Sequence, residues 1–218
     1  MSSIPPRILC LDLGDVVVRI CHTWAEACAR AGLPYHEETP EESAARHGAR
    51  QKLIARHEVN EITDREYFEG LASLSGDRYS ADDVARIHDC WLLGEFDGVA
   101  SLIEEWNRRP GHRTACLSNT NARHWELLSS EALRPGEFPG FRAIQERHAS
   151  QILRLRKPGA EIYQACAREL GAAGGEIVFF DDRPENVVAA RAVGWQAHEI
   201  RHDGDPAAQI RAVLTTLE

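Results

Sequence analysis

The stretch Ile8–Val18, which reads ILCLDLGDVVV, constrains the fold of this chain more than any other. Its apolar start is typical of a strand buried on both faces of a parallel sheet, expected here over residues 7–13. Asp12 falls at the end of that strand, and a buried carboxylate is costly unless it is paired, hydrogen-bonded or bound to a metal. Because ligands bind at the carboxyl ends of strands in open α/β sheets, Asp12 is a candidate site residue. On these residues alone, an Asp that caps a turn is an equally good interpretation.

The charge of the chain limits its partners. The 218 residues carry a net charge of -9, whereas binding to nucleic acid or to an anionic membrane needs a surplus of Lys and Arg. The first apolar run is short and interrupted by Asp12, and no run approaches the length of a membrane span. None of the six cysteines has the C-x-x-C spacing of a zinc or redox motif. We expect a cytoplasmic protein, a monomer or a homodimer, that binds neither nucleic acid nor membranes.

Residues 20–95 differ in character from the rest of the chain. They are rich in Ala, Glu, Arg and His, their apolar residues recur at helical spacing, and they carry no strand signal. Thr63 with Glu66 has the spacing of a capping box, and Ser80 is placed to open another helix. We predict about four helices here, inserted into an α/β core that comprises residues 1–19 and 96–218.

The remainder of the chain alternates between strand and helix patterns. Strands are expected at 112–117, 176–180 and 195–200, with a short one at 141–144, and helices at 159–170, 184–193 and 206–217. This alternation implies right-handed crossovers and a parallel sheet. The predicted fold class is therefore α/β: a Rossmann-like, three-layer core with a small all-helical insertion after the first strand.

Polar residues follow several of the predicted strands and should meet at one edge of the sheet. They are Asp12, Ser118 with Asn119, Asp181 with Asp182, and Lys157 just before a helix. Taken singly, Ser118 and Asn119 are better explained as helix caps, and Lys157 as a solvated loop lysine. Their convergence favours a site, because hydroxyl, amide and backbone N–H donors suit a phosphate and a lysine suits an anion.

The adjacent carboxylates Asp181 and Asp182 point to a metal. Successive strand residues face opposite sides, so one can face a pocket while the other supports it from behind. Like charges placed together repel unless a cation or donors neutralise them. Magnesium fits, because it takes oxygen ligands and keeps some of its waters; Asp12 and Asp182 would supply carboxylates. A helix cap before Pro184 explains one Asp but not both, and Asn186 could orient a carboxylate or be a plain surface residue.

As a set, these residues resemble the four motifs of the haloacid dehalogenase-like hydrolase superfamily, in the family order and over nearly the whole chain. The matching strings are Asp12-Leu-Gly-Asp-Val16, Leu117-Ser-Asn-Thr-Asn121, Arg156-Lys-Pro-Gly-Ala-Glu-Ile-Tyr163 and Phe179-Phe-Asp-Asp-Arg-Pro-Glu-Asn186. They are similar to a bacterial branch that includes sugar-phosphate phosphatases and a relative of the phosphatase domain of epoxide hydrolases. The resemblance implies that residues 20–95 are the small cap of that family.

The resemblance also implies a role for each motif residue. Asp12 would be the nucleophile that forms an aspartyl-phosphate, and Ser118 would hydrogen-bond the phosphoryl group. Asn119 would help to bind phosphate, and Lys157 would neutralise charge on the nucleophile and phosphate. Asp182 would bind Mg²⁺ directly, with Asp181 assisting. The implied activity is Mg²⁺-dependent hydrolysis of a small phosphorylated metabolite, for example a sugar phosphate.

The chain departs from the family pattern at Gly14. Most phosphatases of the family have there a second Asp that acts as general acid and base, a contribution of about 10²–10⁴-fold in rate. The backbone carbonyl of Gly14 could still bind Mg²⁺, and a Gly also occurs here in the similar branch. Asp15 is a weak candidate to replace the acid, because the loop is expected to point it elsewhere.

Two other functions stay open on the sequence. A 2-haloacid dehalogenase would use the same Asp12 but needs no Mg²⁺, so the pair Asp181 and Asp182 argues against it. A weakly catalytic or non-catalytic binding protein is supported by Gly14. Residues of the insertion that could contact a substrate, each more often a surface or packing residue, are His22, Thr23, Trp24, His47, Arg50 and His57.

Overall fold

The core of the computed structural model, which describes residues 6–217, is a five-stranded parallel sheet in the order β5-β4-β1-β6-β7. The strands are β1 (Ile8–Leu11), β4 (Arg113–Ser118), β5 (Glu146–Ala149), β6 (Ile177–Asp181) and β7 (Gln196–Glu199). The fold class predicted from the sequence is confirmed. Residues 1–5 of the predicted first segment lie outside the described part. Strand β1 is central, between β4 and β6, which places its carboxyl end in the middle of one sheet edge.

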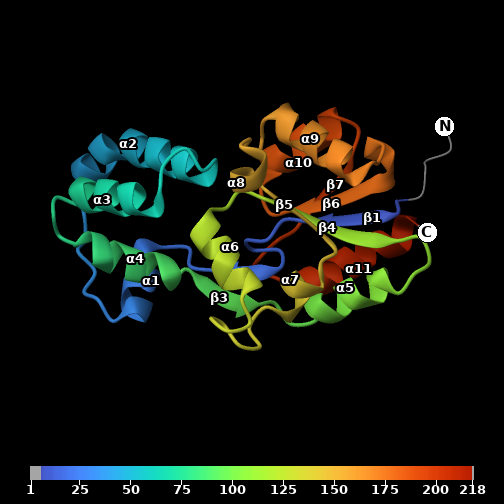
Figure 1. Cartoon of the computed structure of the whole chain (residues 1–218), viewed down its shortest axis with the longest axis horizontal. Helices are drawn as coiled ribbons and strands as arrows, with labels where there is room; N and C mark the ends of the chain where they lie inside the picture. Colours follow the sequence, from blue (N-terminus) through green and yellow to red (C-terminus); the bar gives the residue numbers. More distant parts are fainter. Residues whose placement is uncertain (1–5, 218) are drawn as a thin grey trace.

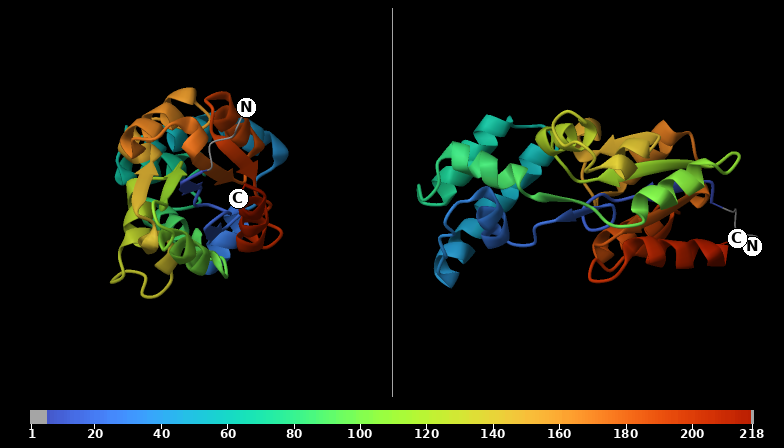
Figure 2. Two further views of the ribbon diagram at one scale, coloured as in Figure 1. Left: turned by 90° about the vertical axis from the view of Figure 1, so that its right-hand side faces the viewer. Right: turned by 90° about the horizontal axis from the view of Figure 1, so that it is seen from below.

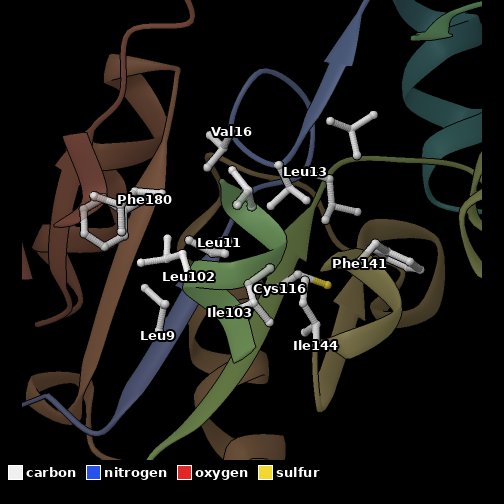
Figure 3. Close-up of a cluster of buried hydrophobic side chains, with 14 of the residues drawn as sticks. Leu9, Leu11, Leu13, Val16, Leu102, Ile103, Cys116, Phe141, Ile144 and Phe180 are labelled. Carbon is white, nitrogen blue, oxygen red and sulfur yellow. The ribbon is translucent and has the colours of Figure 1, made fainter. Parts of the chain in front are cut away.

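Helices cover both faces of the sheet (Figure 1). One face carries α5 (Val99–Asn107), α7 (Pro139–Ala143) and α11 (Pro206–Leu217), and the other carries α9 (Ala160–Leu170) and α10 (Pro184–Ala192). Strand β1 serves both layers because its side chains alternate: Leu9 and Leu11 pack into the first apolar cluster, seen in Figure 3, and Ile8 and Cys10 into the second. Shorter elements complete the core, namely α6 (Ala122–Ser129), α8 (Ser150–Leu153) and a 3₁₀ turn at Gly174–Glu176.

Four helices of the inserted segment pack around an apolar cluster of their own, beyond the carboxyl ends of the strands (Figures 1 and 2). They are α1 (Trp24–Ala31), α2 (Pro40–Glu58), α3 (Asp64–Leu74) and α4 (Ala81–Asp89). Each begins at a Thr or Ser whose hydroxyl accepts a backbone N–H, and the box predicted for Thr63 and Glu66 is present. Within residues 6–217, no helix combines the length and apolar character that crossing a membrane requires.

The chain enters and leaves these helices through two short strands that the sequence did not indicate. Strand β2 (Val18–Ile20) pairs antiparallel with β3 (Leu92–Glu95). The expectation that residues 20–95 contain no strand is therefore wrong at both ends of this range, at Ile20 and at Leu92–Glu95. Segments of three and four residues carry too little periodicity to be recognised, and they pair only because the fold brings the two ends of the insertion together.

The predicted strand at 141–144 is also wrong. Residues Pro139–Ala143 form α7, and the edge strand β5 begins later, at Glu146. Pro139 stands in the first turn, where its fixed φ favours a helix. The carboxylate of Glu95 accepts the backbone N–H groups of Gly140 (2.8 Å) and Phe141 (2.6 Å). This cap comes from a distant segment, so the local sequence gave no sign of it.

Candidate active site

Asp12 occupies the predicted position directly after β1 and is nearly buried, with 7% of its surface exposed. Its Oδ1 atom lies 2.9 Å from the ammonium of Lys157 and accepts the backbone N–H of Leu13 at 2.8 Å. Burial without such partners would be costly for a carboxylate. The Asp12 carboxylate is therefore fixed at the strand end by two hydrogen-bond donors, and its charge is partly offset by Lys157.

Asp181 supports the site from behind. Its side chain is fully buried, and its Oδ2 accepts a hydrogen bond from Lys157 Nζ at 2.6 Å. Asn186 donates to both of its oxygens, at 2.9 and 3.1 Å, and the backbone N–H of Arg183 donates to Oδ1 at 2.9 Å. With these donors in place, Asp181 positions the Lys157 ammonium between itself and Asp12. The adjacent Asp182 is only partly buried, so the two carboxylates differ in environment, as the strand alternation predicts.

Asn119 and Ser118, which follow β4, are used differently. The amide of Asn119 holds the backbone of Lys157 by two reciprocal hydrogen bonds, donating to its carbonyl and accepting its N–H, both at 2.9 Å. The Asn119 side chain thus positions Lys157, a use that its predicted role in phosphate binding did not include. Ser118 ends β4, is 4% exposed and lines a cavity at the sheet edge together with Gly14.

The charges of the site perturb one another. Burial raises the pKa of Asp12 to about 7, against the attraction of Lys157 and with the help of the negative Asp181 and Asp182. Burial and the neighbouring carboxylates Asp181 and Asp15 raise the pKa of Asp182 to about 6. Burial alone would lower the pKa of Lys157, but Asp12 and Asp181 raise it above its usual value. The site thus carries more negative charge than Lys157 offsets.

This donor set fits a magnesium ion. Carboxylate oxygens of Asp12, Asp181 and Asp182 all lie within 4.8 Å of one another. Because Asp181 is taken up by Lys157 and Asn186, Asp12 and Asp182 are the carboxylates left for a cation, with the carbonyl of Gly14 nearby in sequence. Hard oxygen donors with excess negative charge are the surroundings that Mg²⁺ prefers. A cation would also favour the ionised forms whose pKa values burial raises.

Asp15 faces a different group of side chains. It is buried, its Oδ1 lies 3.3 Å from Nε2 of His22, and it is absent from the residues that line the cavity. One of its carboxylate oxygens comes within 4.8 Å of Asp182 and the ring of His202. Because Asp15 pairs with His22 yet lies within 4.8 Å of Asp182, the expectation that it points away from the site stays a prediction.

A cavity of about 490 Å³ separates the sheet edge from helices α1–α4. Of the six residues of the insertion named from the sequence, Trp24 and Arg50 line it and the other four do not. Thr23 caps α1, and His57 stacks on Tyr67 and contacts Asp64 at 2.7 Å, which are structural uses.

Several residues of the cavity wall were missed from the sequence. Asn121 caps α6 only three residues after Ser118, so its closeness to the site could have been inferred from spacing. His88, His124 and Tyr67 also line the cavity. They come from three separate helices, and no local pattern distinguishes them from packing residues.

Comparisons with curated proteins find phosphatases. The chain is 35% identical over 66 residues to the sesquiterpene phosphatase astK of Aspergillus oryzae, a match that covers 26% of this chain and 34% of that protein. It is 28% identical over 116 residues to an enolase-phosphatase E1 of Nocardia farcinica, covering 53% and 48% of the two chains. The chain thus matches less than half the length of each of these relatives.

A solved structure extends the likeness over the whole fold. A HAD family enzyme of Bacteroides thetaiotaomicron, in complex with magnesium and inorganic phosphate, aligns with a TM-score of 0.71 and 19% identity over 94% of this chain and all of that one. At this identity the match speaks for the fold alone. A family model described as haloacid dehalogenase-like hydrolase matches residues 6–194. The chain therefore belongs to the haloacid dehalogenase-like hydrolases.

Proposed function

We propose that this protein is a Mg²⁺-dependent hydrolase of phosphate monoesters of small metabolites, with Asp12 as the nucleophile. One observation carries the proposal: the Asp12 carboxylate is held by Lys157 at the sheet edge, beside the cavity wall formed by Gly14 and Ser118. The phosphatases found among the relatives, and the magnesium and phosphate bound by the Bacteroides enzyme, support the same chemistry.

The proposed reaction has two steps at Asp12. A carboxylate oxygen of Asp12 attacks phosphorus and the bond to the alcohol oxygen breaks, which gives an aspartyl-phosphate and an alcohol that takes up a proton. Water then attacks the phosphoryl group, releasing phosphate and restoring Asp12. Lys157 offsets charge on Asp12 and the phosphoryl oxygens, and the Ser118 hydroxyl donates a hydrogen bond to one of these oxygens. Magnesium, held by Asp12, Asp182 and the Gly14 carbonyl, would supply Lewis-acid stabilisation of the transferring group.

Gly14 places a condition on this chemistry and favours one competing function. With no side chain at position 14, the leaving alcohol must receive its proton from another donor or depart as a stable anion. A protein that only binds phosphorylated molecules would have the same pocket. Hydrolysis of an ester with a good leaving group separates the two possibilities, because it makes little demand on a general acid.

The test is steady-state hydrolysis of para-nitrophenyl phosphate, with and without MgCl₂, by the wild type and Asp12→Asn. The matched control is Asp203→Asn, the same substitution at an exposed carboxylate that pairs with Arg201. We expect Mg²⁺-dependent turnover in the wild type and the control, and none above background in Asp12→Asn. Equal turnover in all three proteins, or turnover that ignores Mg²⁺, would refute the proposal. A 2-haloacid assay without Mg²⁺ would then test the dehalogenase alternative.

A further inference from the structure

The cavity extends away from the sheet edge along α2. Glu58, Ile54 and Arg50 line it at four-residue intervals, so they share one face of the helix. The eight-residue step from Arg50 to Glu58 spans about 12 Å at the helical rise. Glu58 marks the catalytic end, because it accepts a 2.6 Å hydrogen bond from Arg156, the neighbour of Lys157 in the chain. Arg50 marks the far end.

Helix α3 lines the cavity with a second row at the same spacing, Tyr67, Leu71 and Ser75. Tyr67 stacks on His57, with ring centroids 4.0 Å apart, so it lies at the same end as Glu58. Read from the sheet edge outward, each row has an aliphatic residue in the middle and a polar residue, Arg50 or Ser75, at the far end; the near end is the charged Glu58 in one row and the aromatic Tyr67 in the other.

Aliphatic and aromatic side chains make up about half of the residues that line the cavity. Besides Ile54 and Leu71, they are Leu13, Val18, Ile20, Trp24, Tyr35, Tyr67, Tyr79, Trp91, Leu92 and Leu128. The Tyr79 hydroxyl is used within the protein, because it accepts from the His36 backbone N–H and donates to the Pro34 carbonyl, both at 3.0 Å. Apart from its polar ends, this wall has the composition of a site for an apolar group.

The charged and polar groups at the far end are paired with one another except for Nη1 of Arg78, which is buried and has no hydrogen-bond partner among the described residues. Glu38 accepts hydrogen bonds from Arg46 and Arg50, and Arg78 donates to Glu42 at 2.6 Å. The Ser75 hydroxyl donates to the Ala72 carbonyl at 2.6 Å. These groups close the cavity and leave Arg78 Nη1 as a free donor, which is fewer than the row of donors and acceptors that a polyhydroxylated ligand needs.

The histidines nearer the catalytic end are also bonded among themselves. His124 Nε2 lies 2.8 Å from the His88 carbonyl, and the Asn121 amide lies 3.3 Å from His88 Nε2. His88 is 8% exposed, and its Nδ1 has no hydrogen-bond partner among the described residues. Together with Arg78 Nη1 at the far end, two buried and unpaired polar groups belong to residues of the cavity wall, whereas a sugar presents several hydroxyls. Burying hydroxyls without partners is costly.

We propose that the alcohol half of the substrate is an extended apolar group, rather than the sugar suggested by the sequence, and that it lies along the cavity-lining faces of α2 and α3 with its phosphate at Asp12. The inference rests on the proposed function for the position of the phosphate. Ile54 and Leu71 contact the middle of this apolar group, and the aromatic side chains around them exclude water. The enzyme thus selects its substrate by apolar length.

The test measures binding, so it does not depend on turnover. Asp12→Asn with MgCl₂ is titrated calorimetrically with ethyl, butyl and hexyl phosphate, with glucose 6-phosphate and with inorganic phosphate. Complete burial of a methylene corresponds to about a fourfold gain in affinity, so we expect at least about a tenfold gain from ethyl to hexyl phosphate. Glucose 6-phosphate should bind no more tightly than inorganic phosphate. A flat alkyl series, or glucose 6-phosphate binding as tightly as hexyl phosphate, would overturn the inference.

A matched pair of variants, each made in the Asp12→Asn background, ties the effect to the cavity. Leu71 and Leu53 are both partly buried against the apolar cluster of the helices, but only Leu71 lines the cavity. Leu71→Gln should weaken hexyl phosphate binding about tenfold, and Leu53→Gln should leave it within about twofold. Equal losses in the two variants, or no loss in either, would overturn the assignment.

The inference and the proposed function fail in different ways. A flat alkyl series beside Asp12-dependent hydrolysis of para-nitrophenyl phosphate would refute the apolar substrate and leave the phosphatase intact. A steep alkyl series without any hydrolysis would keep the apolar cavity and refute the catalytic proposal.

Discussion

Magnesium binding should depend steeply on pH, because the two carboxylates left for the metal have raised pKa values. Protons compete with Mg²⁺ for Asp12, with a pKa of about 7, and for Asp182, with a pKa of about 6. For each carboxyl, the apparent Kd for Mg²⁺ is multiplied by one plus the ratio of its protonated form to its ionised form. Between pH 8 and pH 5 this factor grows to about 100 for Asp12 and about 10 for Asp182. We therefore expect the Kd for Mg²⁺ to rise about 10³-fold, a change of about 4 kcal/mol.

Isothermal titration of the metal-free protein with MgCl₂ measures this directly. Repeating each titration in buffers with different ionisation enthalpies also counts the protons released. From the same two pKa values, we expect about 1.4 protons per Mg²⁺ at pH 6 and about 0.1 at pH 8. Asp182→Asn should bind Mg²⁺ more weakly, and its pH dependence should shrink to about 10²-fold.

Ordinary carboxyls would behave differently. With pKa values near 3.9, both would be almost fully ionised at pH 5, so the Kd would hardly change and almost no protons would leave at pH 6. A change in Kd of less than about tenfold across this range, with proton release near zero at pH 6, would refute the idea that burial and mutual repulsion prepare the site for a cation.

Three further substitutions test the support around Asp12. Lys157→Met leaves two buried carboxylates without their shared cation, and urea titration at pH 8 should show a loss of about 3–5 kcal/mol in the free energy of unfolding. The loss should be smaller at pH 5. At this pH, below the raised pKa of about 7, the Asp12 carboxyl is protonated in the folded state and no longer needs a cation beside it. Equal losses at pH 5 and pH 8 would contradict this. Asn186→Ala removes two hydrogen bonds to Asp181 and should cost about 2–3 kcal/mol in the same titration, whereas unchanged stability would show that Asp181 does not need them. Asn119→Ala frees the Lys157 backbone and should lower kcat for para-nitrophenyl phosphate about tenfold; an unchanged kcat would separate Asn119 from the positioning of Lys157.

The parallel sheet, and the edge at which its polar residues meet, could be predicted from the residue pattern alone. The uninterrupted apolar runs Ile8–Leu11 and Ile177–Phe180 predict central strands, because such strands have both faces covered, and every residue of both runs is buried. Parallel strands then bring their carboxyl ends to one edge, which is why Asp12, Lys157 and Asp181 could be placed together in advance. The helices of the insertion could also be located, since their Thr and Ser caps lie within three residues of the groups they bind.

Contacts between distant segments were decided only by the tertiary structure. The Glu95 carboxylate caps α7 from 45 residues away, and the Asn119 amide is taken up by the backbone of Lys157, 38 residues later. The strand pattern predicted that Asp181 and Asp182 would face different surroundings. It did not predict that Lys157 and Asn186 would both donate hydrogen bonds to Asp181.

The cavity shows this division most clearly. Ile54 and Leu71 each look like ordinary packing residues of an amphipathic helix, and their spacing is that of any helix face. Only the packing of α2 and α3 side by side, beyond the end of the sheet, brings those two faces into the wall of one pocket. Residue spacing along one helix is a local property, whereas the shape of a cavity depends on how separate helices pack, and that is where the choice of substrate lies.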